Sequence, residues 1–218
     1  MNDHPAAPAT ASEPRPGGSA PFGQVRLLCQ PTKADGFLVF AYELTNQGPL
    51  PVLTMDAWPR QEEGGRRADD QVAQVILRPD GVALVGKYLP AVPPGMRIPS
   101  PVLPLCALLK PGESLKRELR IALPLAEQSP YLPELRLSGY TPRELRGLIF
   151  AIGWWPAAQP GLVAGPAAFA EGLHVVAATG NALPPAGTAT QRFPTTKLDI
   201  MQRRDGFPRG VPAHPELR

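Results

Sequence analysis

The sequence predicts an all-β sandwich of about seven to nine strands. Two observations carry this prediction. Short apolar runs recur along the chain, and most of them end in a turn rich in Pro or Gly. The 21 glycines and 30 prolines among the 218 residues are spread through the chain, and neither residue suits an ordinary helix. A hydrophobic fraction of 43% is enough to build a core between such strands.

The first predicted strands have the alternation that a sheet requires. In QVRLLCQ the apolar side chains share one parity, whereas GFLVFAYEL is apolar on both faces until Glu43, which suits a central strand. The stretch ELTNQGPLPV, residues 43–52, ends this strand. Its Asn and Gly permit a turn, and its two prolines cannot donate to a ladder.

Two later turns introduce further strands. The sequence RPDG at 78–81 joins two Val-rich runs and predicts a hairpin, because Pro pre-sets the turn and Gly takes a positive φ. The sequence KPGE at 110–113 precedes an alternating strand whose apolar face, which carries Leu115, Leu119 and Ile121, is interrupted by Arg117. Lys and Glu on the other face predict that this strand has one side in water.

A short helical turn is predicted near 141–147. In TPRELRG, Thr141 and Glu144 form a capping box and Pro142 suits the first helical position, so one or two turns should end at Gly147. The next stretch, LIFAIGWW, predicts a buried strand. Beyond Pro156 the pattern weakens, although LHVVAAT predicts a strand and residues 196–203 predict an edge strand.

Composition divides the chain into three parts. Residues 1–23 are mostly Pro, Ala, Gly and Ser and predict a disordered tether. Residues 24–186 are expected to form the sandwich domain. Residues 187–218 are expected to form a basic, Pro-rich extension that includes the edge strand.

The two turn stretches carry a resemblance to a known family. Residues 44–48, LTNQG, and 109–114, LKPGES, resemble the strand end and the turn that recur in bacterial immunoglobulin-like modules. The resemblance covers roughly residues 25–155 and implies an immunoglobulin-like sandwich. The antibody-type Cys–Trp–Cys core is absent. A narrower resemblance, to small intracellular proteinase-inhibitor domains of bacteria, lacks the Trp-Ser stretch expected between these turns.

Charge and cysteine content bear on the expected ligands and cellular compartment of the protein. The net charge is only +3, and no dense basic stripe with interleaved aromatics predicts nucleic-acid binding. No apolar run approaches the about 20 residues that cross a bilayer, and the first residues lack the apolar core of a secretory signal. We therefore expect a cytoplasmic protein in which Cys29 and Cys106 are free thiols, although spacing leaves open whether they pair.

No motif predicts catalysis, a metal or a cofactor. His4 and His214 lie in the predicted tails, and His174 has no ligand-type residue at metal-binding spacing. Phosphate-loop and nucleophile-elbow motifs are missing, and the neighbouring carboxylates of the 59–71 segment point to opposite sides of an extended chain. A Cys–His pair formed by His174 with either cysteine remains an open alternative, as does an inhibitor that uses loop 59–71 or 88–104.

The expected function is that of a non-catalytic interaction or scaffold module, with a subunit of a larger assembly as one form of this role. Such a module would bind another protein through its tails or an exposed Trp. On a strand, one of Trp154 and Trp155 should face outward unless the C-terminal segment covers both. The segment 59–71 is expected to be a long mobile hairpin connection, or else a recognition loop. The candidate partner-binding residues are Trp154, Trp155, Arg66, Arg67, Arg203 and Arg204.

Overall fold

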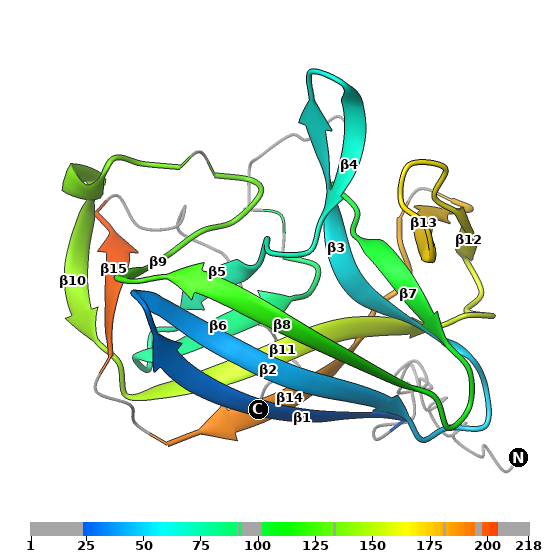
Figure 1. The fold of residues 1–218 in the computed structure, drawn as a ribbon, viewed down its shortest axis with the longest axis horizontal. Helices are drawn as coiled ribbons and strands as arrows, with labels where there is room; N and C mark the ends of the chain where they lie inside the picture. The colour runs from blue at the N-terminus through cyan, green and yellow to red at the C-terminus, as the bar shows by residue number, and fades with distance from the viewer. Residues whose placement is uncertain are drawn as a thin grey trace, which may run out of the picture.

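A computed structural model describes residues 24–90, 92, 102–132, 134–180, 182–194 and 198–204. The described chain is all-β, and its single helical element is a 3-10 turn, η1, at Leu137–Gly139. No described helix is long and apolar enough to cross a membrane. The strands form sheets of three, three and nine strands (Figure 1).

The first sheet has the order β1-β2-β8 and is antiparallel throughout. Its strands are β1 (Val25–Ala34), β2 (Phe37–Asn46) and β8 (Ser114–Ala122). The central position of β2 confirms the prediction from its two-sided apolar pattern. The outer face of β8 carries exposed Lys116, Glu118 and Arg120, as its alternation predicts.

The nine-stranded sheet is branched at β11. Its main path runs β12-β13-β7-β3-β11-β6-β5, with β14 paired to β11 and β4 paired to β3. The strands are β3 (Val52–Glu62), β4 (Gly65–Asp69), β5 (Gln74–Leu77), β6 (Val82–Lys87), β7 (Leu105–Leu109), β11 (Gly147–Pro156), β12 (Leu162–Pro166), β13 (Leu173–Ala178) and β14 (Gly187–Phe193).

The branch follows from the register along β11. One side of β11 pairs with β14 over residues 148–154, and the other pairs first with β6 and then with β3. Strands β6 and β3 therefore lie end to end on the same side of β11. Gly86 permits this arrangement, because its φ is +150° and a Cβ there would overlap the carbonyl oxygen of Ala151.

The main core lies between the three-stranded sheet and one face of the nine-stranded sheet. Alternate residues of β11 enter it, and the Phe150 ring stacks on the Phe40 ring of β2 with centroids 4.6 Å apart. The intervening residues, such as Ile149, are buried on the opposite face of β11 in a second cluster. Because β11 is covered on both faces and bordered on both sides, all its residues except Pro156 are buried.

A small third sheet corrects the prediction of a helical turn at 141–147. Residues Tyr140–Glu144 form β10, which pairs antiparallel with β15 (Asp199–Arg203), and β15 pairs with β9 (Leu125–Ala126). A capping box contributes only about 1 kcal/mol. Strand pairing satisfies the same backbone groups and also buries Tyr140. The predicted strand at 196–203 is present as β15, but it is central in its sheet and not an edge.

The two predicted turn stretches meet through Asn46, which is fully buried. Its side-chain amide donates to the carbonyl oxygens of Leu50 at 2.8 Å and Leu109 at 3.0 Å. Its backbone N–H donates to Glu113 O, and its carbonyl accepts from Gly112 N–H. The KPGE turn connects β7 in one sheet to β8 in the other, so Asn46 fastens both connections between the sheets.

The predicted C-terminal extension begins inside the main sheet. Residues 187–193 form β14, so the boundary that we placed at 186 does not separate the sandwich from an extension. The tether at 1–23 and residues 205–218 lie outside the described residues, as do residues 91, 93–101 and 195–197.

Candidate functional site

Both tryptophans of the predicted binding pair are buried. Trp154 is 4% exposed and belongs to the main core, whereas Trp155 is 0% exposed and packs in the cluster of Leu53 and Met55. The Trp155 indole N–H donates to the Pro184 carbonyl at 3.0 Å. Of the two expectations for this pair, the structure has the one in which the C-terminal segment covers both, because residues after β13 cover the second face of β11.

The two C-terminal arginines differ in environment. Arg203 is 8% exposed, its guanidinium lies over the Tyr140 ring, and its backbone N–H donates to the Glu127 carboxylate at 2.8 Å. Burial raises the pKa of Glu127, and this shift is partly opposed by the hydrogen bonds that its carboxylate accepts from the N–H groups of Arg203 and Leu77. This contact fastens the small sheet to the main one. Arg204 is exposed.

The segment 59–71, predicted as a mobile hairpin connection or a recognition loop, is itself largely a β-hairpin that projects from the sheet (Figure 1). Trp58, which precedes the segment, lies in β3 and is buried. The hairpin pairs Trp58 with Asp69 and Glu62 with Gly65, so a two-residue turn closes it. Its backbone therefore presents its side chains on two defined faces.

The two faces of the hairpin carry different charges. On one face Arg60 contacts Asp69 at 3.1 Å and Arg67 lies 3.8 Å from Glu62. On the other face Arg66 stands opposite Gln61 and forms no ion pair with any described residue. The hairpin neutralises its own charges on the first face and leaves one cation on the second.

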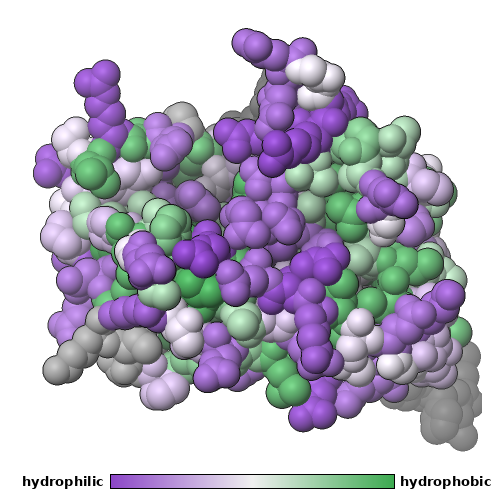
Figure 2. All heavy atoms as spheres, viewed as in Figure 1, coloured by the Kyte–Doolittle hydropathy of each residue, from purple (hydrophilic) through white to green (hydrophobic). Residues whose placement is uncertain are grey.

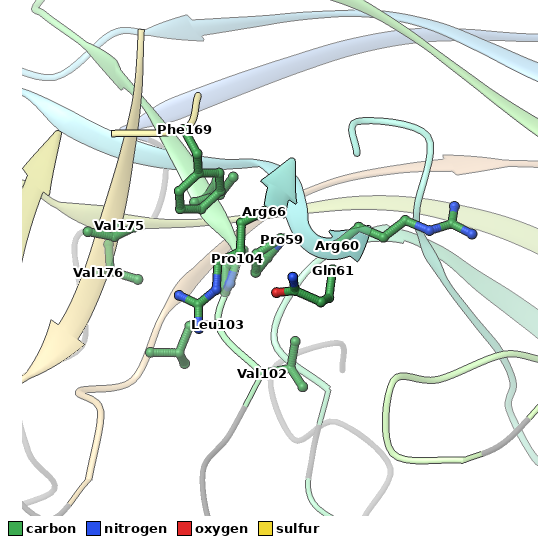
Figure 3. Close-up of a pocket in the computed structure, with 11 residues that line it drawn as sticks. Pro59, Arg60, Gln61, Arg66, Val102, Leu103, Pro104, Phe169, Val175 and Val176 are labelled. Atoms are coloured by element: carbon green, nitrogen blue, oxygen red, sulfur yellow. The ribbon is translucent and has the colours of Figure 1, made fainter. Parts of the chain in front are cut away.

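Arg66 faces a groove of about 450 Å³ between the hairpin, the segment that enters β7, and the β12–β13 hairpin. The apolar walls are formed by Val102, Leu103, Phe169 and Val175, of which Val102 and Val175 are exposed. Figure 3 shows the Arg66 guanidinium among the lining residues, whereas that of Arg60 extends away from them. Figure 2 shows hydrophobic side chains gathered over β7, beside the hydrophilic tip of the hairpin.

A second polar group, which we call the Asp56 cluster, lies between the two main sheets, where all its members except the partly exposed Arg117 are buried. It consists of Asp56, Lys87, Arg117 and Tyr42. Arg117 Nε and Nη2 donate to the Asp56 carboxylate at 3.1 and 2.9 Å, and Lys87 Nζ donates to the Asp56 carbonyl at 2.6 Å. Lys87 Nζ also lies 5.7 Å from the centre of the Tyr42 ring.

The strand geometry explains the Asp56 cluster. Pairing of β3 with β7 shifts between Met55 and Ala57, so this bulge leaves Asp56 without a partner on β7. Lys87 ends β6 beside the branch point and supplies a donor to the Asp56 carbonyl. Burial lowers the pKa of Lys87, while Asp56 opposes that shift. Hydrogen bonding to Asp56 raises the pKa of Arg117.

Sequence reasoning missed both sites, for different reasons. The residues of the groove come from four separate segments and form no motif, so no local signal marks them. The Asp56 cluster did leave a signal, because Arg117 interrupts an apolar face and Lys87 stands in the apolar stretch VALVGKYL. Single charges in buried strands predict a buried ion pair.

The cysteines and His174 do not meet in one exposed site. His174 and Cys106 are cross-strand partners on β13 and β7, but Cys106 is 0% exposed and burial raises its pKa. Cys29 lies in the other sheet, and burial raises its pKa to about 12. Both thiols are free. The described residues include no group of three or more His, Cys, Asp or Glu side chains that could hold a metal ion.

Comparison of the chain with protein-family models, with curated proteins and with solved structures gave no match.

Proposed function

We propose that the protein is a non-catalytic interaction module and that the groove beside Arg66 is its binding site. The supporting observation is an exposed apolar concavity with one unneutralised guanidinium at its mouth. Apolar walls with a few placed polar groups are typical of binding sites. Arginine is enriched among the residues that contribute most to interfaces.

The chemistry of the groove favours binding over catalysis. Its described ionisable lining residues are Arg60 and Arg66, and a guanidinium stays protonated at neutral pH. Neither residue can serve as a general base there. The Asp56 cluster is richer in ionisable groups, but Asp56 and Lys87 are enclosed between the sheets and already bonded to one another.

The immunoglobulin-like resemblance is compatible with this role and remains part of the proposal. Two sheets across one core, and connections fastened at Asn46, are the features that support it. Modules of this architecture serve many functions, so the fold by itself does not select a partner.

A pull-down from a lysate of the native host tests the proposal. The baits are the full chain, a groove variant with Val175→Glu, and a matched variant with Leu137→Glu. Leu137 is also an exposed apolar residue, but it lies in η1 and does not line the groove. We expect a set of proteins retained by the full chain and by Leu137→Glu but lost with Val175→Glu.

Identical captures by all three baits would contradict the groove as the binding site. Circular dichroism of each variant checks that the sheets are intact. Because both substitutions replace exposed side chains, each should change the free energy of unfolding by less than about 0.5 kcal/mol.

A further inference from the structure

We propose that the groove takes an extended peptide, which pairs as a strand with the free edge of β13 and places an acidic side chain on Arg66. This inference rests on the proposed function and adds the class of partner and its binding mode.

The ladder between β13 and β7 stops early. Only Leu173 with Ala107 and His174 with Cys106 are paired. The same register would bring Val175 opposite Leu105 and then Val176 opposite Pro104, which has no N–H to donate. Pro104 therefore ends the ladder at the groove, while β13 continues to Ala178.

The peptide groups of Val176 face this open side. On its other side β13 forms backbone hydrogen bonds with β12. Two bonds show which residues of β13 take part: Ala167 N–H donates to Leu173 O, and Thr179 N–H donates to Gly161 O. Antiparallel bonds alternate, so the odd-numbered residues of β13 bond to β12. The N–H and carbonyl of Val176 consequently point toward the groove, where no described strand pairs with them.

Other sheet edges are closed by glutamine side chains. Gln191 accepts from Cys29 N–H at 2.7 Å and donates to Cys29 O at 3.0 Å, which caps the edge of β1. Gln71 accepts from Arg120 N–H and donates to Glu118 O, which caps the edge of β8. Each amide takes the place of a peptide group on a neighbouring strand. At Val176 no described side chain does this. Val176 is only 5% exposed, but it lines the groove, so a ligand would reach its peptide groups from there.

Apolar walls flank the open edge on both faces of the sheet. Leu103 packs with the cluster that contains Val176, and Phe169 packs with the cluster that contains Leu105. Successive side chains of an added strand point to opposite faces, so both walls would be contacted by alternate residues. The volume of about 450 Å³ fits a few residues, since small-ligand pockets span about 300–1,000 Å³.

The charge of the groove selects an acidic partner. Arg60 and Arg67 are engaged by carboxylates of the hairpin itself, whereas Arg66 is not. A guanidinium pairs well with a carboxylate, which forms two parallel hydrogen bonds with it. We assign this carboxylate to an Asp or Glu side chain, because capture of a chain terminus typically uses a nest of backbone N–H groups, and the donor here is a side chain.

The test begins with a phage library of random dodecapeptides, panned against the immobilised full chain. Enriched peptides are synthesised, and their dissociation constants are measured by fluorescence anisotropy. We expect sequences with apolar residues at every second position and one Asp or Glu. Single N-methylations should weaken binding at least tenfold at alternate positions and leave the intervening positions within about twofold.

Arg66→Glu should weaken binding at least tenfold, whereas the matched variant Arg67→Glu should stay within about twofold. Replacing the peptide's Asp or Glu by its amide should weaken binding to the full chain but not to Arg66→Glu. Amidation of the peptide's C-terminus should change nothing. Sensitivity to C-terminal amidation alone would overturn the assignment of the carboxylate.

The remaining outcomes separate this inference from the proposed function. If the pull-down shows proteins that depend on Val175 but the library gives no peptide, the groove binds a folded surface and the strand proposal is wrong. N-methylation effects without a period of two, or equal loss with Arg66→Glu and Arg67→Glu, would also overturn it. If the pull-down does not depend on Val175 and the enriched peptides bind Val175→Glu as tightly as the full chain, the proposed function itself fails.

Discussion

The Asp56 cluster and the groove use the same kind of charge in opposite ways. In the cluster, Arg117 bonds the Asp56 carboxylate through two nitrogens, and Lys87 donates to the Asp56 carbonyl, so each cation has a partner inside the protein. In the groove, Arg66 has apolar neighbours and no carboxylate among the described residues. Cations that are bonded inside the protein stabilise one arrangement of strands, whereas a cation without a described carboxylate partner at an exposed concavity is free to bind.

The comparison extends to the backbone. At the bulge in β3, the unpaired Asp56 carbonyl receives a side-chain donor from Lys87. At the end of the β13–β7 ladder, the polar groups of Val176 receive none from the described residues. Strand pairing is interrupted at both places, and among the described residues only the first interruption is compensated by a side-chain hydrogen bond. The predictions below measure how far this difference holds.

The largest effect is expected from Asp56→Ala. The substitution leaves Lys87 and Arg117 without their shared counter-charge between the sheets, which should cost about 3–5 kcal/mol of unfolding free energy. Urea unfolding followed by Trp fluorescence measures this cost. Asp69→Ala is the control, because its pair with the mostly exposed Arg60 should contribute less than about 1 kcal/mol. Similar losses in both variants would remove the distinction between the buried and exposed pairs.

Matched arginine truncations compare the two regions directly. Arg117→Ala removes the bidentate partner of a buried carboxylate and should cost about 2 kcal/mol, reduced because Arg117 is partly exposed. Arg66→Ala should change stability by less than about 0.5 kcal/mol, since no described group depends on it. Thermal and urea unfolding of the two variants give the difference. A destabilised Arg66→Ala would mean that Arg66 has a structural role.

The pH dependence of stability tests the buried ammonium. Burial places the folded-state pKa of Lys87 below its unfolded value of 10.5, so its contribution is present above 10.5 and is lost as pH falls through the folded pKa. The free energy of unfolding should therefore rise with pH toward 10.5, with a slope of at most about 1.4 kcal/mol per pH unit from this group. Lys87→Met should remove that rise. Parallel pH curves for the wild type and Lys87→Met would show that Lys87 titrates normally.

The smallest effect is expected at a closed edge. Gln191→Ala opens the β1 edge at Cys29 and should cost about 1 kcal/mol, because two partly buried hydrogen bonds are lost. Amide hydrogen exchange is the sharper measurement, since the Cys29 N–H should lose protection while amides in the centre of β2 keep theirs. Unchanged exchange at Cys29 would mean that the edge is closed by something other than this side chain.

Local signals predicted much of the fold. The turn at 78–81 and the turn at 110–113 lie where their Pro and Gly residues placed them, with Gly81 at φ 79° and Gly112 at φ 78°. The apolar runs at 37–44 and 148–155 form the central strands β2 and β11. These features depend on neighbouring residues alone, which is why they can be predicted from the sequence.

The misplaced features share a different cause. The capping box at 141–144 lost to pairing with β15, which lies about sixty positions further along the chain. Trp155 is covered by the segment around Pro184, which lies 29 positions further along the chain. Both outcomes were decided by contacts between distant segments, which no local pattern reports. The hairpin at 59–71 is a local element by contrast, because it forms by pairing of residues 58–62 with 65–69.

The sequence by itself determined that the chain is all-β and where two of its turns fall, because backbone preferences and alternating hydrophobicity act over a few residues. It also marked Lys87 and Arg117 as charges out of place. Only the tertiary structure decided that these two share Asp56, that Pro104 ends a ladder opposite Val176, and that Arg66 faces Phe169 and Val175. Strand order and register bring these residues together. Both are set by long-range strand pairing, which depends on all the strands of the fold together.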